Sequence, residues 1–195
     1  MASILNVDQI NNAAGTSAIT IDPSTGKPSF PNGATLPAGS VIQVVQDIET
    51  ADGSQSLNVG DFSTAILSAS ITPVSTSSKI LVLCNLNLAT STATAGAAGL
   101  LKRDGTPIGV GDAESGSAQA TGGGLGSNIS TRLISNIAMT ILDSPSTTSA
   151  ITYTAHGKHG LAGTAVVYWN REYATPAGGG NARVSSTLTL MEIAG

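Results

Sequence analysis

The chain has few charged and few aromatic side chains. Of its 195 residues, 10% are charged and 3% are aromatic, whereas a charged fraction of about 25% is usual. The eight lysines and arginines are scattered and the net charge is −4, so no basic patch is available to track a nucleic-acid backbone. This composition excludes a nucleic-acid partner, and the low charge indicates a protein that assembles with others.

Cysteine and long apolar runs are also scarce. The one cysteine, Cys84, cannot form an internal disulfide, and we expect it to be a small buried hydrophobe. No run approaches the roughly 18 apolar residues of a membrane span. The N-terminus lacks the basic residues and the apolar core of a secretory signal. We therefore expect a soluble protein without membrane insertion.

The residues that are abundant favour β-structure. Hydrophobic residues make up 41% of the chain, and 23 residues are glycine. Many of the rest are threonine, valine and isoleucine, which are enriched in strands. Mean hydropathy is positive, at +0.20. Disordered chains combine low hydrophobicity with high net charge, so global disorder is excluded.

From Gly39 onward the sequence predicts eight or nine strands and no helix. In 79–89, apolar residues alternate on one face, and Asp104-Gly105 is typical of a type I′ hairpin turn. A third segment places Leu133, Ile137, Met139 and Ile141 on one face. This spacing predicts an all-β, jelly-roll-like β-sandwich over 39–195, preceded by an extended segment, 1–38. The expected strands lie in 40–47, 61–71, 79–89, 100–109, 131–143, 150–156, 164–173 and 184–194.

Motifs for catalysis or metal binding are weak. His156 and His159 lie in a glycine-containing stretch without a nearby cysteine or carboxylate pair, and we expect a solvated loop. Asp112 and Glu114 are too few for calcium. The sequence has no phosphate-binding glycine motif, no GxSxG and no positioned carboxylate pair. We therefore expect no cofactor, no metal and no enzymatic activity, with glycan cleavage as the alternative left open.

The segment 168–173 holds the only tryptophan and two of the three tyrosines. Strand alternation predicts that Trp169 shares a face with Arg171 and Tyr173, opposite to Tyr168. The favoured interpretation of Trp169 is packing in the core or at a subunit interface, and the alternative is a recognition surface. The candidate receptor-binding residues are Asn170, Arg171, Tyr173 and Asn181, and we expect the loops 111–130 and 174–182 to determine specificity.

The N-terminal segment alternates short apolar pieces with turn residues and is too short to close its own core. Its short sequence motifs "N.AGT", "TID..G" and "FPNG" are followed by LPAGSVIQV. Over residues 4–46 these motifs resemble the leader of bacteriophage tail-fibre and related virion-fibre proteins. The resemblance implies that this segment attaches to the particle or intertwines with sister chains. The residues expected to make the attachment are Ile4, Leu5, Val7, Ile10, Ile19, Ile21 and Phe30.

The order of segments after Gly39 is similar to the tip domain of such fibres, which resembles the trimeric tumour necrosis factor and complement globular-head folds. The resemblance implies a homotrimer that is made in a host cytoplasm and exposed on the virion exterior. Other virion proteins and a host-surface glycan or outer-membrane receptor are the expected partners. The alternative is a capsid decoration or head-fibre protein without an essential receptor role. Because 195 residues leave almost no shaft, a short fibre or a knob-like decoration is favoured over a long tail fibre.

Overall fold

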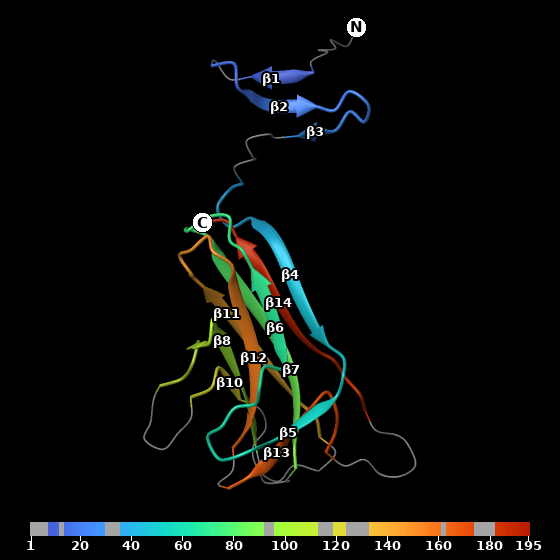
Figure 1. Cartoon of the computed structure of the whole chain (residues 1–195), viewed down its shortest axis with the longest axis vertical. Helices are drawn as coiled ribbons and strands as arrows, with labels where there is room; N and C mark the ends of the chain where they lie inside the picture. Colours follow the sequence, from blue (N-terminus) through green and yellow to red (C-terminus); the bar gives the residue numbers. More distant parts are fainter. Residues whose placement is uncertain are drawn as a thin grey trace. The chain divides into compact units, whose positions relative to one another are not determined.

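The computed structural model describes residues 8–11, 14–29, 36–91, 96–112, 119–123, 133–160, 163–173 and 182–195. Within these ranges the regular secondary structure consists of antiparallel β-strands, without a helix. The predicted all-β class is confirmed. Within these ranges no helix is long and apolar enough to span a membrane. The chain divides into two compact units, Met1–Pro37 and Ala38–Gly195, which Figure 1 draws in sequence colours.

The first unit contains a three-stranded antiparallel sheet of β1 (Gln9–Asn11), β2 (Ser17–Ile21) and β3 (Pro28–Ser29). Asp22 forms the turn after β2, since its Oδ1 accepts hydrogen bonds from the backbone N–H groups of Ser24 and Thr25. The Ser24 hydroxyl and these two N–H groups lower the pKa of Asp22 to about 2. This side chain therefore stabilises the turn as an acceptor over most of the pH range.

The second unit is a two-sheet sandwich (Figure 1). One sheet, here called the β7 sheet, has the order β4-β14-β7-β13-β5, with β11 on the other edge of β7. The other, the β12 sheet, has the order β10-β8-β12-β6, with β9 also paired to β8. The strands are β4 (Val41–Glu49), β5 (Gly53–Leu57), β6 (Leu67–Ile71), β7 (Lys79–Thr90), β8 (Ala97–Arg103), β9 (Thr106–Ile108), β10 (Gly122–Gly123), β11 (Ser135–Asp143), β12 (Ile151–His159), β13 (Ala165–Trp169) and β14 (Ser186–Ile193).

The strand order is that of a jelly roll. The first long strand, β4, pairs with the last, β14, and β14 pairs with β7, while β6 pairs with β12 in the opposite sheet. After β4 and β5, which share the β7 sheet, the chain crosses to the β12 sheet for β6, returns for β7 and crosses again for β8, as in a double-sheet jelly roll. The predicted β-sandwich of this type is confirmed.

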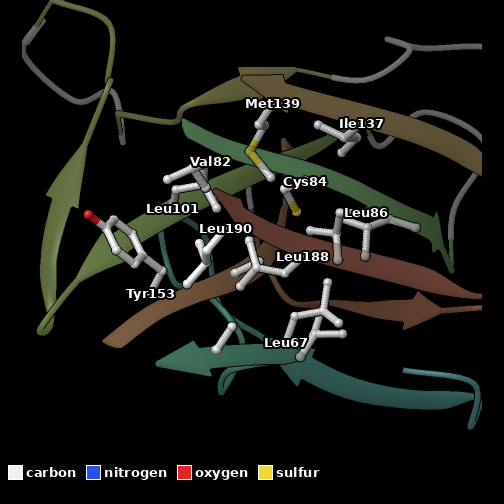
Figure 2. Packing of buried hydrophobic residues seen from close by; sticks show 14 of the residues in the cluster. Leu67, Val82, Cys84, Leu86, Leu101, Ile137, Met139, Tyr153, Leu188 and Leu190 are labelled. Carbon is white, nitrogen blue, oxygen red and sulfur yellow. The ribbon is translucent and has the colours of Figure 1, made fainter. Parts of the chain in front are cut away.

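The core lies between the sheets and is centred on β7. Ile80, Val82, Cys84, Leu86 and Leu88 are each at most 2% exposed, which confirms the predicted period-two face. Figure 2 shows Val82, Cys84 and Leu86 of this row in one cluster with Leu188 and Leu190 of β14 and Leu67, Leu101 and Tyr153 of the β12 sheet. Burial raises the pKa of the Cys84 thiol to about 12, so Cys84 is the small buried hydrophobe expected.

Several predicted element boundaries differ from the structure. The hairpin at Asp104-Gly105 is confirmed, since Arg103 pairs with Thr106 and both turn residues have positive φ. Strand β13 ends at Trp169 instead of continuing to Tyr173, and β12 continues to His159. The sequence analysis did not predict β5, because Gly53, Ser54, Gln55 and Ser56 carry no apolar pattern.

An ion pair joins the two sheets at one edge of the core. Both carboxylate oxygens of Asp143 in β11 accept hydrogen bonds from Arg103 Nη1 of β8, at 2.9 and 2.8 Å. The hydroxyl of Tyr153 in β12 donates to Asp143 Oδ2 at 2.7 Å, and in Figure 2 it points away from the leucines. Burial and this hydrogen bond raise the pKa of Tyr153, so the phenol stays protonated and keeps donating.

A fully buried carboxylate fixes the loop between β6 and β7. Glu192 of β14 is 0% exposed, and its oxygens accept hydrogen bonds from the Gln43 amide and from the backbone N–H of Val74. The Gln43 amide also donates to Thr72 O. Burial alone would raise the pKa of Glu192, but the hydrogen bonds outweigh it and lower the pKa below 4.5. The ionised form is thus the one that holds the loop.

Glu192→Gln should lower the free energy of unfolding at pH 7 by about 2 kcal/mol, because the amide cannot accept at both positions. The folded-state pKa lies below the unfolded value, so the carboxylate's contribution is full above about pH 4.5 and is lost as the pH falls further. Urea unfolding of both proteins at pH 7 and pH 3 should therefore show a smaller difference at pH 3. Asp61→Asn, at an exposed carboxyl, controls for the charge, and an equal loss in both variants would contradict the assignment.

Candidate functional site

The segment that follows β13 is held by one buried amide. Asn170 is 0% exposed and has a φ of 60°, a conformation that asparagine tolerates better than most residues. Its Nδ2 donates to Glu49 O and Ala51 O, at 2.8 and 2.9 Å, and its Oδ1 accepts from the Ser186 hydroxyl at 2.7 Å. Asn170 thus fixes the ends of β4, β13 and β14 against one another.

The positive φ of Asn170 ends the strand alternation and brings Tyr168, Arg171 and Tyr173 together. The Arg171 Cζ lies 4.6 Å from the centroid of the Tyr168 ring, within cation–π range. The Tyr168 and Tyr173 ring centroids are 5.4 Å apart, with the rings tilted by 45°. Tyr173 is 36% exposed. The cluster therefore presents an aromatic and cationic surface beside β5 and β13, which lie far from the C-terminus in Figure 1.

Two residues that are distant in sequence complete the cluster. Arg183 forms an isolated antiparallel bridge with Arg171. Asp52 Oδ2 lies 3.4 Å from Arg171 Nε and 4.0 Å from Arg183 Nε. The side chain of Arg171 is 23% exposed, that of Arg183 is 48% exposed and that of Asp52 is 41% exposed. One carboxylate is thus shared by two guanidiniums at the surface.

The structure corrects the predicted site in two respects. Asn170 cannot contact a receptor directly, because it is completely buried and both of its side-chain polar atoms form hydrogen bonds within the fold. Trp169 packs against the core, which confirms the favoured interpretation, and a Cβ on Gly53 would lie 2.1 Å from its ring. The predicted shared face is wrong, because Arg171 and Tyr173 lie against Tyr168 instead. Asn181 lies outside the described residues. Arg171 and Tyr173 are the two candidates that the fold brings together.

The sequence analysis missed Asp52 and Arg183 as members of this surface. Both lie outside the predicted strands that carry the other candidates, and their approach depends on the antiparallel pairing of β5 with β13. The Ala51-Asp52-Gly53 turn, with its small flanking residues, was the one available signal. The turn approaches Arg171 only because β5 pairs with β13, more than 100 residues later in the chain. A local sequence pattern therefore could not place Asp52 beside Arg171.

The histidines are not in a solvated loop, contrary to the prediction. His156 and His159 are buried in β12, where His156 Nδ1 hydrogen-bonds with Ser63 O and His159 Nε2 with Leu57 O, each at 2.9 Å. Burial lowers the pKa of His156. These side chains tie the 57–63 segment to β12. Among the described residues, no cluster of three or more histidine, cysteine or acidic side chains could hold a metal ion.

The predicted attachment residues fall partly within the structure. Ile10 of β1 is 47% exposed, and Ile19 and Ile21 of β2 are half-buried. Ile4, Leu5, Val7 and Phe30 lie outside the described residues, as do most of the loops 111–130 and 174–182. At least Ile10 is therefore accessible for contact with another protein. Attachment through this segment stays a prediction.

A second surface is the outer face of the β7 sheet, here called the uncharged face. The strand register places Val44, Met191, Leu81 and Leu142 in one row across β4, β14, β7 and β11. Val44 and Leu142 are 55% and 54% exposed. The remaining members are Gln46, Ile48, Thr187, Thr189, Leu83, Asn85, Asn87, Asn136, Ala138 and Thr140. None of these members is charged, and the charged residue Lys79 borders them at the exposed start of β7, opposite Ile193.

The outer face of the β12 sheet differs. There the register aligns Ser68 and Ser70 with Thr154 and Thr152, and Lys102 lies opposite Thr154. Lys158 is on the same face, with its Nζ 5.3 Å from the Phe62 ring centroid. This face therefore carries hydroxyls and two lysines, Lys102 and the largely buried Lys158. On the outer side of β4, β14, β7 and β11 the one lysine, Lys79, lies at the start of β7.

Comparisons with known proteins show no family and weak structural similarities. No protein-family model matches the chain, and no curated protein matches it. A structure of the Gt strain of infectious bursal disease virus is 12% identical, with a TM-score of 0.37. A crystal structure of the VP2 subviral particle of the same virus is 13% identical, with a TM-score of 0.36. The match covers 90% of this chain and 46% and 45% of those chains, so this chain spans less than half of either; at these values the similarity carries no functional argument.

Asn170→Ala should lower the free energy of unfolding by about 3 kcal/mol, because it removes three buried hydrogen bonds and leaves alanine at a positive φ. Asn170→Gly removes the same bonds without the steric cost and should be less destabilising by about 1 kcal/mol. Denaturant unfolding measures both. Asn85→Ala, on an exposed strand position, is the matched control, and an equally small effect at both positions would contradict this role of Asn170.

Proposed function

We propose that this chain is a non-enzymatic structural protein of a virion, a short bacteriophage fibre that assembles as a homotrimer. The sandwich is its tip, and the N-terminal segment attaches it to other virion proteins. The observation that carries the proposal is the uncharged face of the β7 sheet. The resemblance of residues 4–46 to fibre leaders supports the same function independently.

The uncharged face has the character of a protein interface. Solvent-exposed sheets usually present charged or polar side chains, and a contiguous apolar surface marks a contact site. The cores of homo-oligomer interfaces are depleted of charge, as this face is. Its polar members also pair among themselves, since Gln46 Nε2 donates to Thr189 Oγ1 and Asn136 Nδ2 to Asn87 Oδ1. Covering such a face leaves few unsatisfied groups, and three copies follow from the resemblance to trimeric tips.

The cluster of Arg171, Tyr168 and Tyr173 is the part of the tip proposed to contact the host surface. It is accessible, and it is held on a rigid base by Asn170. A trimer would present three equivalent copies of this cluster on one body. Weak binding at each copy would be multiplied by avidity without any new contact.

The homotrimer is tested by the native mass of the purified full chain, measured by light scattering. The expected mass is about three times 19.3 kDa. Thr189→Glu places a charge in the middle of the uncharged face and should yield monomers, because a desolvated unpaired carboxylate opposes association. A monomeric wild-type chain would contradict the proposal.

Thr152→Glu is the matched control on the other sheet. Thr152 and Thr189 are both half-buried strand residues, and each hydroxyl has one side-chain partner, Ser70 for Thr152 and Gln46 for Thr189. The same substitution at Thr152 should leave the trimer intact. Dissociation of both variants to the same extent would mean that the charge acts through general destabilisation and that the uncharged face is not the interface.

A further inference from the structure

The contacts between Arg171, Arg183 and Asp52 leave hydrogen-bond donors unused. A guanidinium carries five N–H donors. Arg171 Nε is buried and has no hydrogen-bonded partner, with Asp52 Oδ2 at 3.4 Å. Arg183 Nη1 reaches Ala182 O at 3.4 Å, and no Nη group of Arg171 has a hydrogen-bond partner within the described part of the chain. The pair can therefore bind a further oxyanion.

Asp52 is a weak internal partner for these two arginines. Its distances of 3.4 and 4.0 Å to the two Nε atoms are longer than the 2.7–2.9 Å or so of a charge-assisted hydrogen bond. The side chain is also 41% exposed, and exposed ion pairs contribute little free energy. Glu172 and Glu49, the other nearby acids, are engaged within the fold: Glu172 is buried and accepts a hydrogen bond from Ala182 N, and Glu49 accepts one from Ala51 N. An incoming anion therefore has little to displace.

The aromatic part of the cluster adds a flat apolar surface beside the donors. Tyr173 is 36% exposed and lies next to the Tyr168 ring, over which Arg171 is placed. The two faces of a sugar ring differ in polarity, and the C–H face packs on aromatic rings of this kind. Guanidinium donors and an exposed ring at one place fit a ligand that is both anionic and ring-shaped.

We propose that Arg171, Arg183 and Tyr173 bind an acidic saccharide unit. The two guanidiniums hold its anionic group, Tyr173 packs against its ring, and Asp52 lies beside the anion position when the site is empty. The ligand class is a polysaccharide that bears carboxylate, sulfate or phosphate groups. This inference rests on the proposed host-contact function and specifies the class of host-surface ligand that the cluster takes.

Binding is tested with the full chain by biolayer interferometry on immobilised polygalacturonate, a polysaccharide with one carboxylate on each unit. Dextran is the neutral probe, dextran sulfate carries sulfate in place of carboxylate, and polyphosphate is an anion without sugar rings. We expect polygalacturonate or dextran sulfate to bind at 0.1 M salt, and the stronger of the two identifies the anionic group. Dextran and polyphosphate should bind at least tenfold more weakly, since each lacks one of the two recognised features.

Substitutions separate this site from general charge. Arg171→Gln combined with Arg183→Gln should weaken binding by about tenfold or more, and Tyr173→Ala should also weaken it. Asp52→Asn should strengthen binding, because it removes the internal competitor for the guanidiniums. That opposite effect cannot result from misfolding. Lys27→Gln combined with Lys102→Gln removes the same two positive charges elsewhere and should leave binding unchanged.

Three results would overturn the inference. The first is that the wild-type chain binds neither polygalacturonate nor dextran sulfate. The second is that it binds dextran as strongly as these acidic polysaccharides. The third is that it binds polyphosphate as strongly as the acidic polysaccharides and that Tyr173→Ala does not change this binding. The last would indicate simple ion exchange. Because the native mass is measured independently, a trimer that fails to bind would remove this inference and leave the proposed assembly in place, whereas a monomer would remove the assembly.

Discussion

The fold depends on strand β7, which is hydrogen-bonded to neighbouring strands along both edges and buried on its inner face. β7 pairs with β11 along one edge and with β14 and then β13 along the other, so it fixes the register of most of its sheet. Its inner row, from Ile80 to Leu88, is almost completely buried. A shift of this strand by one residue would expose the whole row. The aliphatic alternation in 79–89 is thus the constraint on which both the sandwich and its outer surfaces depend.

Much of the fold could be predicted from the sequence because its signals are local. The alternation in β7 and the Asp104-Gly105 turn each depend on residues within one element. The candidate site was less predictable, because it forms where elements meet. Asn170 looked like an exposed receptor residue, yet its amide joins β4 to β14. His156 and His159 looked like loop residues because Gly157 lies between them, but β12 continues through that glycine.

The two outer faces of the sandwich show how a chain with 10% charged residues can distribute its polarity. Lys102 and Lys158 lie on the outer face of the β12 sheet. The outer face of the β7 sheet carries amides, hydroxyls and aliphatic groups, with Lys79 at the start of β7. The carboxylates of Asp143, which is partly exposed, and of Glu192, which is fully buried, accept hydrogen bonds within the fold. Most of the outer face of the β7 sheet is therefore without charge, and the proposed contact with other copies of the chain rests on that property.

The course of β4 has a mechanical consequence. This strand begins at Val41, directly after the N-terminal segment, and ends at Glu49, where Asn170 holds the backbone beside the arginine and tyrosine cluster. A pull between the leader and a ligand held at that cluster would run along the axis of β4. Such a load shears the ladder between β4 and β14, in which all hydrogen bonds from Val41 to Glu49 resist together. A strand loaded at right angles would instead lose its bonds one at a time, so this geometry suits a domain that works under tension.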